Sequence, residues 1–315
     1  MEKDQMKGLE LLQVLCEIPG AASDEGKVAS FVKKYVETYA KDWKVQPQII
    51  SGKGFQDCVM LIFGKPRTAI YAHMDSIGFS VAYNNNLSKV GGPRLIEGMQ
   101  LVGEDSLGAI ETELMIVEHE DGTKDLSAVY DREIERGTLL TFKPNFRETE
   151  DFIQSPYMDN RLGMWNALKV AESLEDGAIV FSCYEEHGGN AVGYCAKYLM
   201  EQHGVYQALI SDITWATDGV PQGKGVAISM RDSMLPRRSY LNRIIELAKK
   251  SEIDFQLEVE SAGGSDGGVL QKGDLPIDWC FIGAAEDNVH TPDEIVAKYD
   301  IMCMVELYKY LMIHL

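Results

Sequence analysis

Two adjacent glutamates follow an apolar segment near the middle of the chain. The stretch Phe181–Asn190 reads FSCYEEHGGN, so Glu185 and Glu186 come directly after what looks like a buried strand and before two glycines. Neighbouring residues of a regular strand face opposite sides, but glycines permit a bend that brings both carboxylates toward one site. Buried carboxylates are costly unless they are paired or bind a metal. The stretch therefore predicts a metal site.

Four further motifs carry side chains of the same kinds. Each lies at or near the end of an apolar run or at the start of a helix, and the ligand crevice of an open α/β sheet lies at the carboxyl ends of its strands. We therefore expect the motifs to meet in space. They are AHMD with His73 and Asp75, YMDN with Asp159, SDIT with Asp212, and DNVHTPDE with His290.

Together these side chains match the ligands of a borderline divalent metal. Two histidines and several carboxylates, without a thiolate, suit zinc, cobalt or manganese. A co-catalytic pair of ions about 3.5–4 Å apart needs roughly five protein ligands, one of them a bridging carboxylate. We predict two divalent ions, with zinc as the first choice, bound by His73, Asp159, Glu186, Asp212 and His290.

Two carboxylates remain for other roles in the reaction. Asp75 lies two residues after His73, so on the same strand it would face the same side and accept a hydrogen bond from the second imidazole nitrogen. Glu186 would bind a metal, and Glu185 would take a proton from a water whose pKa the metals have lowered. We predict Glu185 as the general base and Asp75 as the residue that orients His73.

The order of the motifs resembles that of the co-catalytic metallo-aminopeptidases. His-x-Asp is followed by Asp, Glu-Glu, Asp and a late His, and within that clan the chain is similar to the glutamyl/deblocking aminopeptidase family that builds tetrahedral assemblies. The resemblance covers nearly the whole chain and is carried by LLQVLCEIPGAASDEGKV, AHMDSIGF, YMDNRLG, YEEHGG, SDIT, GGSDGG and VHTPDEI. It implies an aminopeptidase for short peptides with a free N-terminus, and a homo-oligomer.

The resemblance also implies a role for each ligand. Asp159 would bridge the two metals. One ion would add His73 and Asp212, and the other would add Glu186 and His290.

Hydrophobic periodicity predicts the elements that position these motifs. Apolar runs closed by turn residues predict strands, and apolar residues at helical spacing predict helices. From Gly78 to about Phe146 only short apolar runs separated by turn residues occur. We expect helices at 10–17, 24–39 with Ser23 as the N-cap, 161–174, 191–202, 238–250 and 300–313, and strands at 57–64, 68–75, 178–184, 208–212, 225–230, 255–260 and 278–283.

This alternation predicts an α/β fold that a β insert interrupts. The resemblance implies a metallo-exopeptidase-like three-layer α/β/α domain with a mixed sheet, formed by residues 1–78 and 147–315. Residues 79–146 would form the small all-β insert domain. We expect this insert to mediate oligomerisation and to limit access to the site.

Composition narrows the cellular setting and the partners. The 315 residues include 49 acidic and 30 basic ones, and a formal charge of -19 disfavours nucleic acid and anionic membranes as partners. No window approaches the roughly 18 apolar residues of a membrane helix, and the charged start of the chain is unlike a signal peptide. Six scattered cysteines predict reduced, mostly buried thiols. We expect a cytoplasmic protein.

Alternative interpretations remain at this point. An N-acyl amino-acid deacylase or carboxypeptidase shares the fold, although those families carry their extra domain after the residue that corresponds to Asp212. A glycosidase that uses Glu185 or Glu186 with a distant carboxylate as its acid/base pair leaves both histidines and Asp212 unexplained. A catalytically inactive scaffold would not need a full ligand set. Asp159 taken alone also suits a helix N-cap, and His187 suits either a substrate contact or a cover over the glycine turn.

Overall fold

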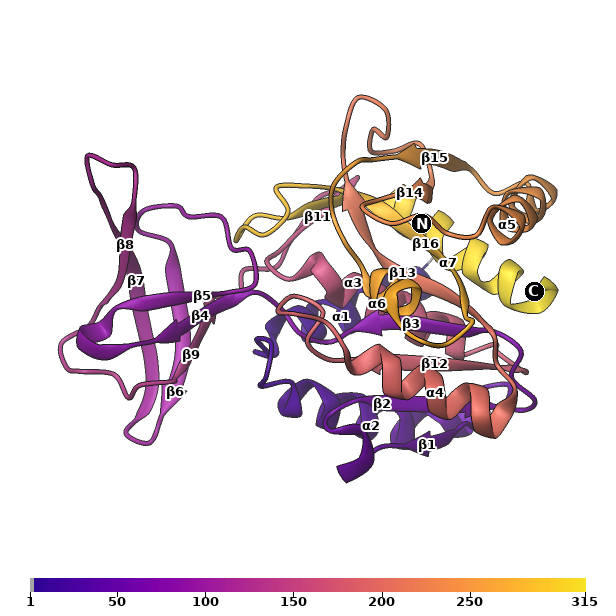
Figure 1. Ribbon diagram of the computed structural model, residues 1–315, viewed down its shortest axis with the longest axis horizontal. Coiled ribbons are helices and arrows are strands. Elements are labelled where there is room, and N and C mark those ends of the chain that lie inside the picture. The colour runs from indigo at the N-terminus through magenta and orange to yellow at the C-terminus, as the bar shows by residue number, and fades with distance from the viewer. Residues whose placement is uncertain (1–2) are drawn as a thin grey trace.

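The computed structural model describes residues 3–315, with side chains from Gly8 onward. The chain forms a large mixed sheet covered by helices and a smaller antiparallel sheet that projects to one side (Figure 1). This arrangement confirms the predicted α/β fold class with an additional all-β unit. No helix within residues 3–315 is long and apolar enough to cross a membrane.

The large sheet has eleven strands in the order β1-β2-β12-β3-β13-β16-β17-β11-β10, with β14 beside β16 and β15 beside β14. The central strands β12, β3, β13 and β16 run parallel to one another, and β14 and β15 are also parallel. The strands are β1 (Gln48–Ile50), β2 (Val59–Phe63), β3 (Ala69–His73), β10 (Arg147–Glu148), β11 (Phe152–Gln154), β12 (Gly177–Ser182), β13 (Gln207–Trp215), β14 (Val226–Arg231), β15 (Phe255–Val259), β16 (Asp278–Asp287) and β17 (Ile295–Ala297).

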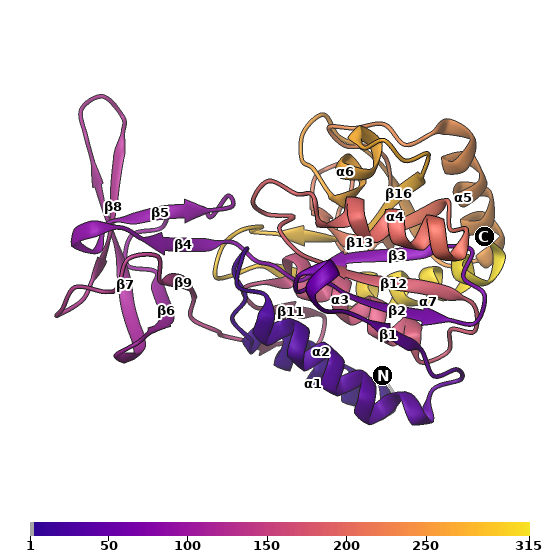
Figure 2. The ribbon, with the colours of Figure 1, turned by 60° about the horizontal axis from the view of Figure 1, so that its bottom comes forward.

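Helices cover both faces of this sheet, which explains why the central strands are continuously apolar. Every residue of β2, β3 and β12 is buried. Figure 2 shows α4 and α6 on one side of the sheet and α1, α3 and α7 on the other. The helices are α1 (Lys3–Glu17), α2 (Gly26–Tyr39), α3 (Met158–Ala171), α4 (Ala191–His203), α5 (Arg238–Ser251), α6 (Asp266–Lys272) and α7 (Lys298–His314), with short 3₁₀ helices at Ala40–Asp42, Lys53–Phe55 and Tyr83–Asn85.

The expected start of α2 is wrong, and the alternative interpretation of Asp159 as a helix N-cap is not correct either. Ser23 does not cap α2, because the helix begins at Gly26 and Ser23 has φ 81° in the turn before it. The Ser23 amide instead donates to the Glu25 carboxylate at 3.0 Å. Asp159 is likewise not the N-cap of α3, since it lies inside the first turn with ψ 102°.

The smaller sheet has six antiparallel strands in the order β5-β4-β9-β6-β7-β8 and a core of its own. Tyr157 joins this core from the start of α3. Its ring stacks on Phe142 with centroids 5.9 Å apart, and its hydroxyl donates to the Phe142 carbonyl at 3.0 Å. Tyr157, two residues before Asp159, thus anchors the start of α3 in the core of the smaller sheet. Its strands are β4 (Gly78–Val81), β5 (Leu87–Val90), β6 (Gln100–Asp105), β7 (Gly108–Glu118), β8 (Lys124–Val129) and β9 (Leu139–Phe142).

All six cysteines are free and buried, as the sequence predicts. Cys58 and Cys183 are the nearest pair that forms a hydrogen bond, with sulfur atoms 3.7 Å apart.

Candidate active site

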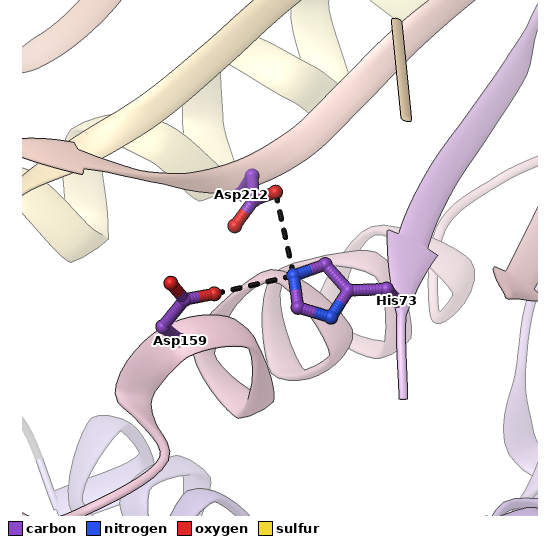
Figure 3. A group of neighbouring side chains, drawn as sticks. All are labelled: His73, Asp159 and Asp212. Carbon is purple, nitrogen blue, oxygen red and sulfur yellow. Dashed lines mark ion pairs between the residues drawn. The ribbon is translucent and has the colours of Figure 1, made fainter. Parts of the chain in front are cut away.

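His73, the last residue of β3, lies between two carboxylates (Figure 3). Its Nε2 atom is 3.2 Å from Asp159 Oδ1 and 3.5 Å from Asp212 Oδ2. Its Nδ1 atom is 3.1 Å from the backbone carbonyl of Asp75, which accepts a hydrogen bond from Nδ1–H. In a metal-bound protein, that contact would leave the Nε2 lone pair of His73 available to a cation.

A second group of ligands shares Asp159 with the first. His290 Nε2 lies 3.3 Å from Asp159 Oδ2 and 3.4 Å from Glu186 Oε2. Each oxygen of the Asp159 carboxylate therefore faces a different histidine. This is the arrangement expected of a carboxylate that bridges two cations. The structure thus brings together all five residues that the sequence singled out as ligands.

The local fold explains how residues so distant in sequence meet. His73 and the turn after Ser182 lie beside each other because β3 and β12 pair in parallel with His73 opposite Ser182. Asp212 lies within β13, which continues to Trp215 instead of ending at residue 212 as predicted. Its neighbour on β16 is Gly283, where any side chain would collide with the Asp212 backbone at 2.3 Å.

Asp75 differs from its predicted position, because β3 ends at His73 and Asp75 lies in the bend beyond it. One carboxylate oxygen is 3.5 Å from His73 Nδ1. The same carboxylate accepts hydrogen bonds from the backbone amides of Glu185 at 3.1 Å and Glu186 at 2.9 Å. Asp75 is completely buried. It therefore connects the histidine to the turn that carries both glutamates.

Dense negative charge and burial shift the protonation equilibria of the site. Burial raises the pKa of Asp212 to about 6 against the opposing charge of His73. Burial and the neighbouring charge of Asp159 raise the pKa of Glu186 to about 7. Burial opposes the charged form of His290, yet Asp159 and Glu186 outweigh it and raise its pKa to about 11. The two histidines only partly offset the cost of burying these carboxylates together, and a bound cation would offset more of it.

The donor set fits divalent cations. Glu186 Oε1 is buried and has no hydrogen-bond partner among the described residues, although a buried carboxylate oxygen normally has one. Two imidazoles and three carboxylates without a thiolate are the ligands that zinc, cobalt and manganese accept. His73, Asp159, Glu186, Asp212 and His290 would hold the metal.

Glu185 lines the same cavity as the ligand groups, whose volume is about 250 Å³. Burial raises the pKa of the Glu185 carboxyl well above its ordinary value, with His73 opposing the shift and Asp212 and Glu186 adding to it. Because Asp75 binds the Glu185 backbone amide, the side chain projects from a fixed turn. A carboxylate that lines the cavity beside the ligand groups is a candidate for a general base.

Sequence reasoning missed Glu294, which is 1% exposed and connects two ligand segments. Its Oε1 atom accepts the His290 amide at 2.9 Å and its Oε2 atom accepts the Asp159 amide at 3.3 Å. The motif DNVHTPDE contains this glutamate four residues after His290, so the signal was present in the sequence.

The β insert also reaches the site through the segment after β5. The Gly92 carbonyl accepts a hydrogen bond from His290 Nδ1 at 3.0 Å, and the Arg94 amide donates to the His290 carbonyl at 3.0 Å. The Gly91 amide donates to His187 Nδ1 at 3.1 Å. His187 thus connects the glutamate turn to the insert. No local sequence pattern predicts these contacts.

Comparison with known proteins relates most of the chain to aminopeptidases. A family model described as M42 glutamyl aminopeptidase matches residues 103–307. A relative from Acetivibrio thermocellus, named "Putative aminopeptidase", is 25% identical over 345 residues that cover 98% of each chain.

Solved structures show the same fold at low sequence identity. An aminopeptidase from the archaeon Desulfurococcus kamchatkensis has a TM-score of 0.85 at 18% identity, over 99% of this chain and 96% of that chain. The TET1 peptidase of Pyrococcus horikoshii, which can assemble into a tetrahedron or a large octahedral shell, has a TM-score of 0.79 at 19% identity, over 96% of this chain and 98% of that chain. Because the family model covers most of the sequence, this chain belongs to the M42 glutamyl aminopeptidase family and is an aminopeptidase, as its motifs predicted.

Proposed function

We propose that this aminopeptidase uses two divalent ions, with zinc as the first choice of metal, to release N-terminal residues from short peptides in the cytoplasm. The observation that carries the proposal is the pair of ligand groups that share Asp159. One ion is assigned to His73, Asp159 and Asp212. The other is assigned to Asp159, Glu186 and His290.

The chain's own residues then divide the work of peptide hydrolysis. Bound divalent ions supply Lewis acidity, which polarises the scissile carbonyl and makes water an effective nucleophile near neutral pH. Glu185 accepts the proton of the attacking water and passes it to the leaving amine. Asp75 keeps Glu185 and Glu186 in orientation through their backbone amides, and it keeps His73 in the required tautomer.

The two glutamates provide the decisive experiment. Glu185→Gln removes the proton acceptor and keeps its shape, so turnover should fall by a factor on the order of 10²–10⁴ while metal content is unchanged. Glu186→Gln replaces a charged ligand with a weak neutral one, so metal affinity should fall and added metal should restore part of the rate. Metal analysis beside rate measurements checks both, with the exposed Glu37→Gln on α2 as the control.

Four results would contradict the proposal. Metal loss from Glu185→Gln, or two retained ions and full rate in Glu186→Gln, would show that the roles are reversed. Full activity in protein that elemental analysis shows to be metal-free would remove the metal mechanism. Equal rates on acetylated and free peptides would favour a deacylase or an endopeptidase.

We also propose that the β insert, residues 79–146, mediates homo-oligomer formation and limits access to the site. The structure supports this with three exposed apolar side chains on one face of β7 and β8, namely Met115 at 42%, Val117 at 47% and Val129 at 56% exposure. Val117→Glu with Val129→Glu should yield a smaller particle by light scattering. Point substitution is preferable to deletion of the insert, because deletion would also remove the Gly92 contact with His290. A wild-type protein that is already monomeric would refute the assembly role.

A further inference from the structure

The cavity that contains the ligand groups has a second, differently built wall. Besides the proposed catalytic residues, it is lined by residues from the end of β13, from the segment after β14, from β15 and from the loop between β15 and α6. Three of them are carboxylates: Asp232, Glu258 and Glu260. No lysine or arginine lines the cavity within the described chain. We name these three residues the acidic wall.

The carboxylates of the acidic wall lack a cationic partner. Glu258 is 2% exposed and accepts a hydrogen bond from the Thr214 hydroxyl. Asp232 accepts the Met234 amide at 2.5 Å. Within residues 3–315 none of the three carboxylates forms an ion pair.

Arg231 is the cation next to this wall in sequence, but its side chain is exposed to solvent and does not line the cavity. Burial raises the pKa of Glu258 and of Asp232, with Arg231 only partly opposing the shift at Asp232. Negative charge inside a partly buried cavity is costly unless a cation enters. The wall is therefore complementary to a positively charged ligand group.

Apolar side chains line the approach to these carboxylates. Trp215, Phe281, Val289 and Ala262 contribute to the same cavity. Lysine and arginine side chains place their methylene stems on apolar surface and their charged heads among polar groups. The cavity offers both an apolar surface for the methylene stem and carboxylates for the charged head.

We propose that the acidic wall is the subsite for the N-terminal side chain of the peptide and that it selects lysine or arginine there. The inference rests on the proposed aminopeptidase reaction, because it assigns a wall of that same cavity. A carboxylate at the end of a substrate side chain would meet like charge and find no cation, so glutamyl peptides should be poor substrates.

The α-ammonium group of the substrate is a second cation that the acidic wall is able to bind. Loss of one carboxylate would then slow all substrates equally. Selection of a cationic side chain predicts a different pattern, in which only lysyl and arginyl substrates are affected. Substrates that differ only in the side-chain charge separate the two cases.

The test compares lysyl, norleucyl and glutamyl p-nitroanilides with the metal-loaded full-length enzyme. The wild type should show kcat/KM for the lysyl substrate on the order of 10–100-fold above the norleucyl one, as for a charge-assisted hydrogen bond, and lowest for the glutamyl one. Glu260→Gln should reduce this ratio and spare the norleucyl rate. Glu260→Lys should invert the preference toward glutamyl. Glu37→Gln, on the exposed face of α2, is the charge-matched control and should change nothing.

Calorimetric binding of lysinamide and norleucinamide tests the subsite separately from turnover. If lysinamide binds more tightly than norleucinamide and Glu260→Gln abolishes the difference, the subsite is supported. Absence of anilide cleavage in the same protein would contradict the proposed reaction and not the subsite. Equal kcat/KM for lysyl and norleucyl substrates, a glutamyl preference in the wild type, or a uniform loss for all substrates in Glu260→Gln would overturn the inference.

Discussion

Glu294 offers a direct test of how the ligand segments are held together. Its carboxylate is buried and accepts one amide from each of two segments, His290 at 2.9 Å and Asp159 at 3.3 Å. In Glu294→Gln only one side-chain oxygen remains, and the new NH₂ group faces a backbone N–H donor. One of the two buried amides therefore loses its acceptor.

The expected magnitude follows from that count. An unsatisfied buried donor costs about 1–3 kcal/mol, and loss of a group that orients metal ligands typically lowers metal affinity or activity by about 10–100-fold. Because Asp159 serves both ligand groups, we expect weaker binding of metal at both. Isothermal titration of the metal-free protein with zinc, beside thermal unfolding with and without metal, measures the two effects.

Glu286→Gln is the matched control. Glu286 is 1% exposed on β16, and in the described part of the chain neither of its carboxylate oxygens has a hydrogen-bond partner. The same substitution there removes a buried carboxyl without removing a hydrogen bond, so metal affinity should stay close to that of the wild type. A Glu294→Gln protein that binds zinc and turns over substrate as well as the Glu286→Gln control would refute the reasoning.

Three further predictions concern the surroundings of the site and the core. Gly92→Ala places a methyl group 3.1 Å from His290 Nδ1, so kcat should fall about tenfold. The control Gly54→Ala, whose added methyl group meets no described atom within 4 Å, should leave kcat unchanged. An unchanged kcat in Gly92→Ala would contradict the prediction. Burial and the charge of Asp75 raise the pKa of Glu25 to about 7 from 4.5, so the folded state holds the extra proton and stability falls as pH rises through that window. Glu25→Gln should therefore match the wild type near pH 4.5 and exceed it by up to about 3 kcal/mol at pH 8 in denaturant titrations; a pH-independent difference would refute it. Tyr308→Phe removes a hydroxyl 2.7 and 2.8 Å from carbonyls of β13 and β16 and should lower the unfolding free energy by about 1–3 kcal/mol, again by denaturant titration, whereas an unchanged value would show that these carbonyls find other donors.

Local patterns predicted most elements because they depend on residues a few positions apart. The strands around 57–64 and 178–184 and the helices around 191–202 and 238–250 are present with small shifts of their ends. The errors occur where a tertiary neighbour extends or ends an element. β16 continues from residue 283, the predicted end, to Asp287 because β13 and β17 pair with its last residues, and β3 ends before Asp75 because that carboxylate binds the glutamate turn.

The sequence by itself determined the fold class, the family and the five residues that gather at the site, since motif order and residue type carry that information. It did not determine that Asp159 divides its two oxygens between two histidines, that Gly92 of the insert binds His290, or that three carboxylates form the wall of the cavity. Those relations join segments that are far apart along the chain. They exist only once strand pairing and the packing of the insert have fixed the distances, because hydrogen bonds and ion pairs act over a few ångströms whatever the separation in sequence.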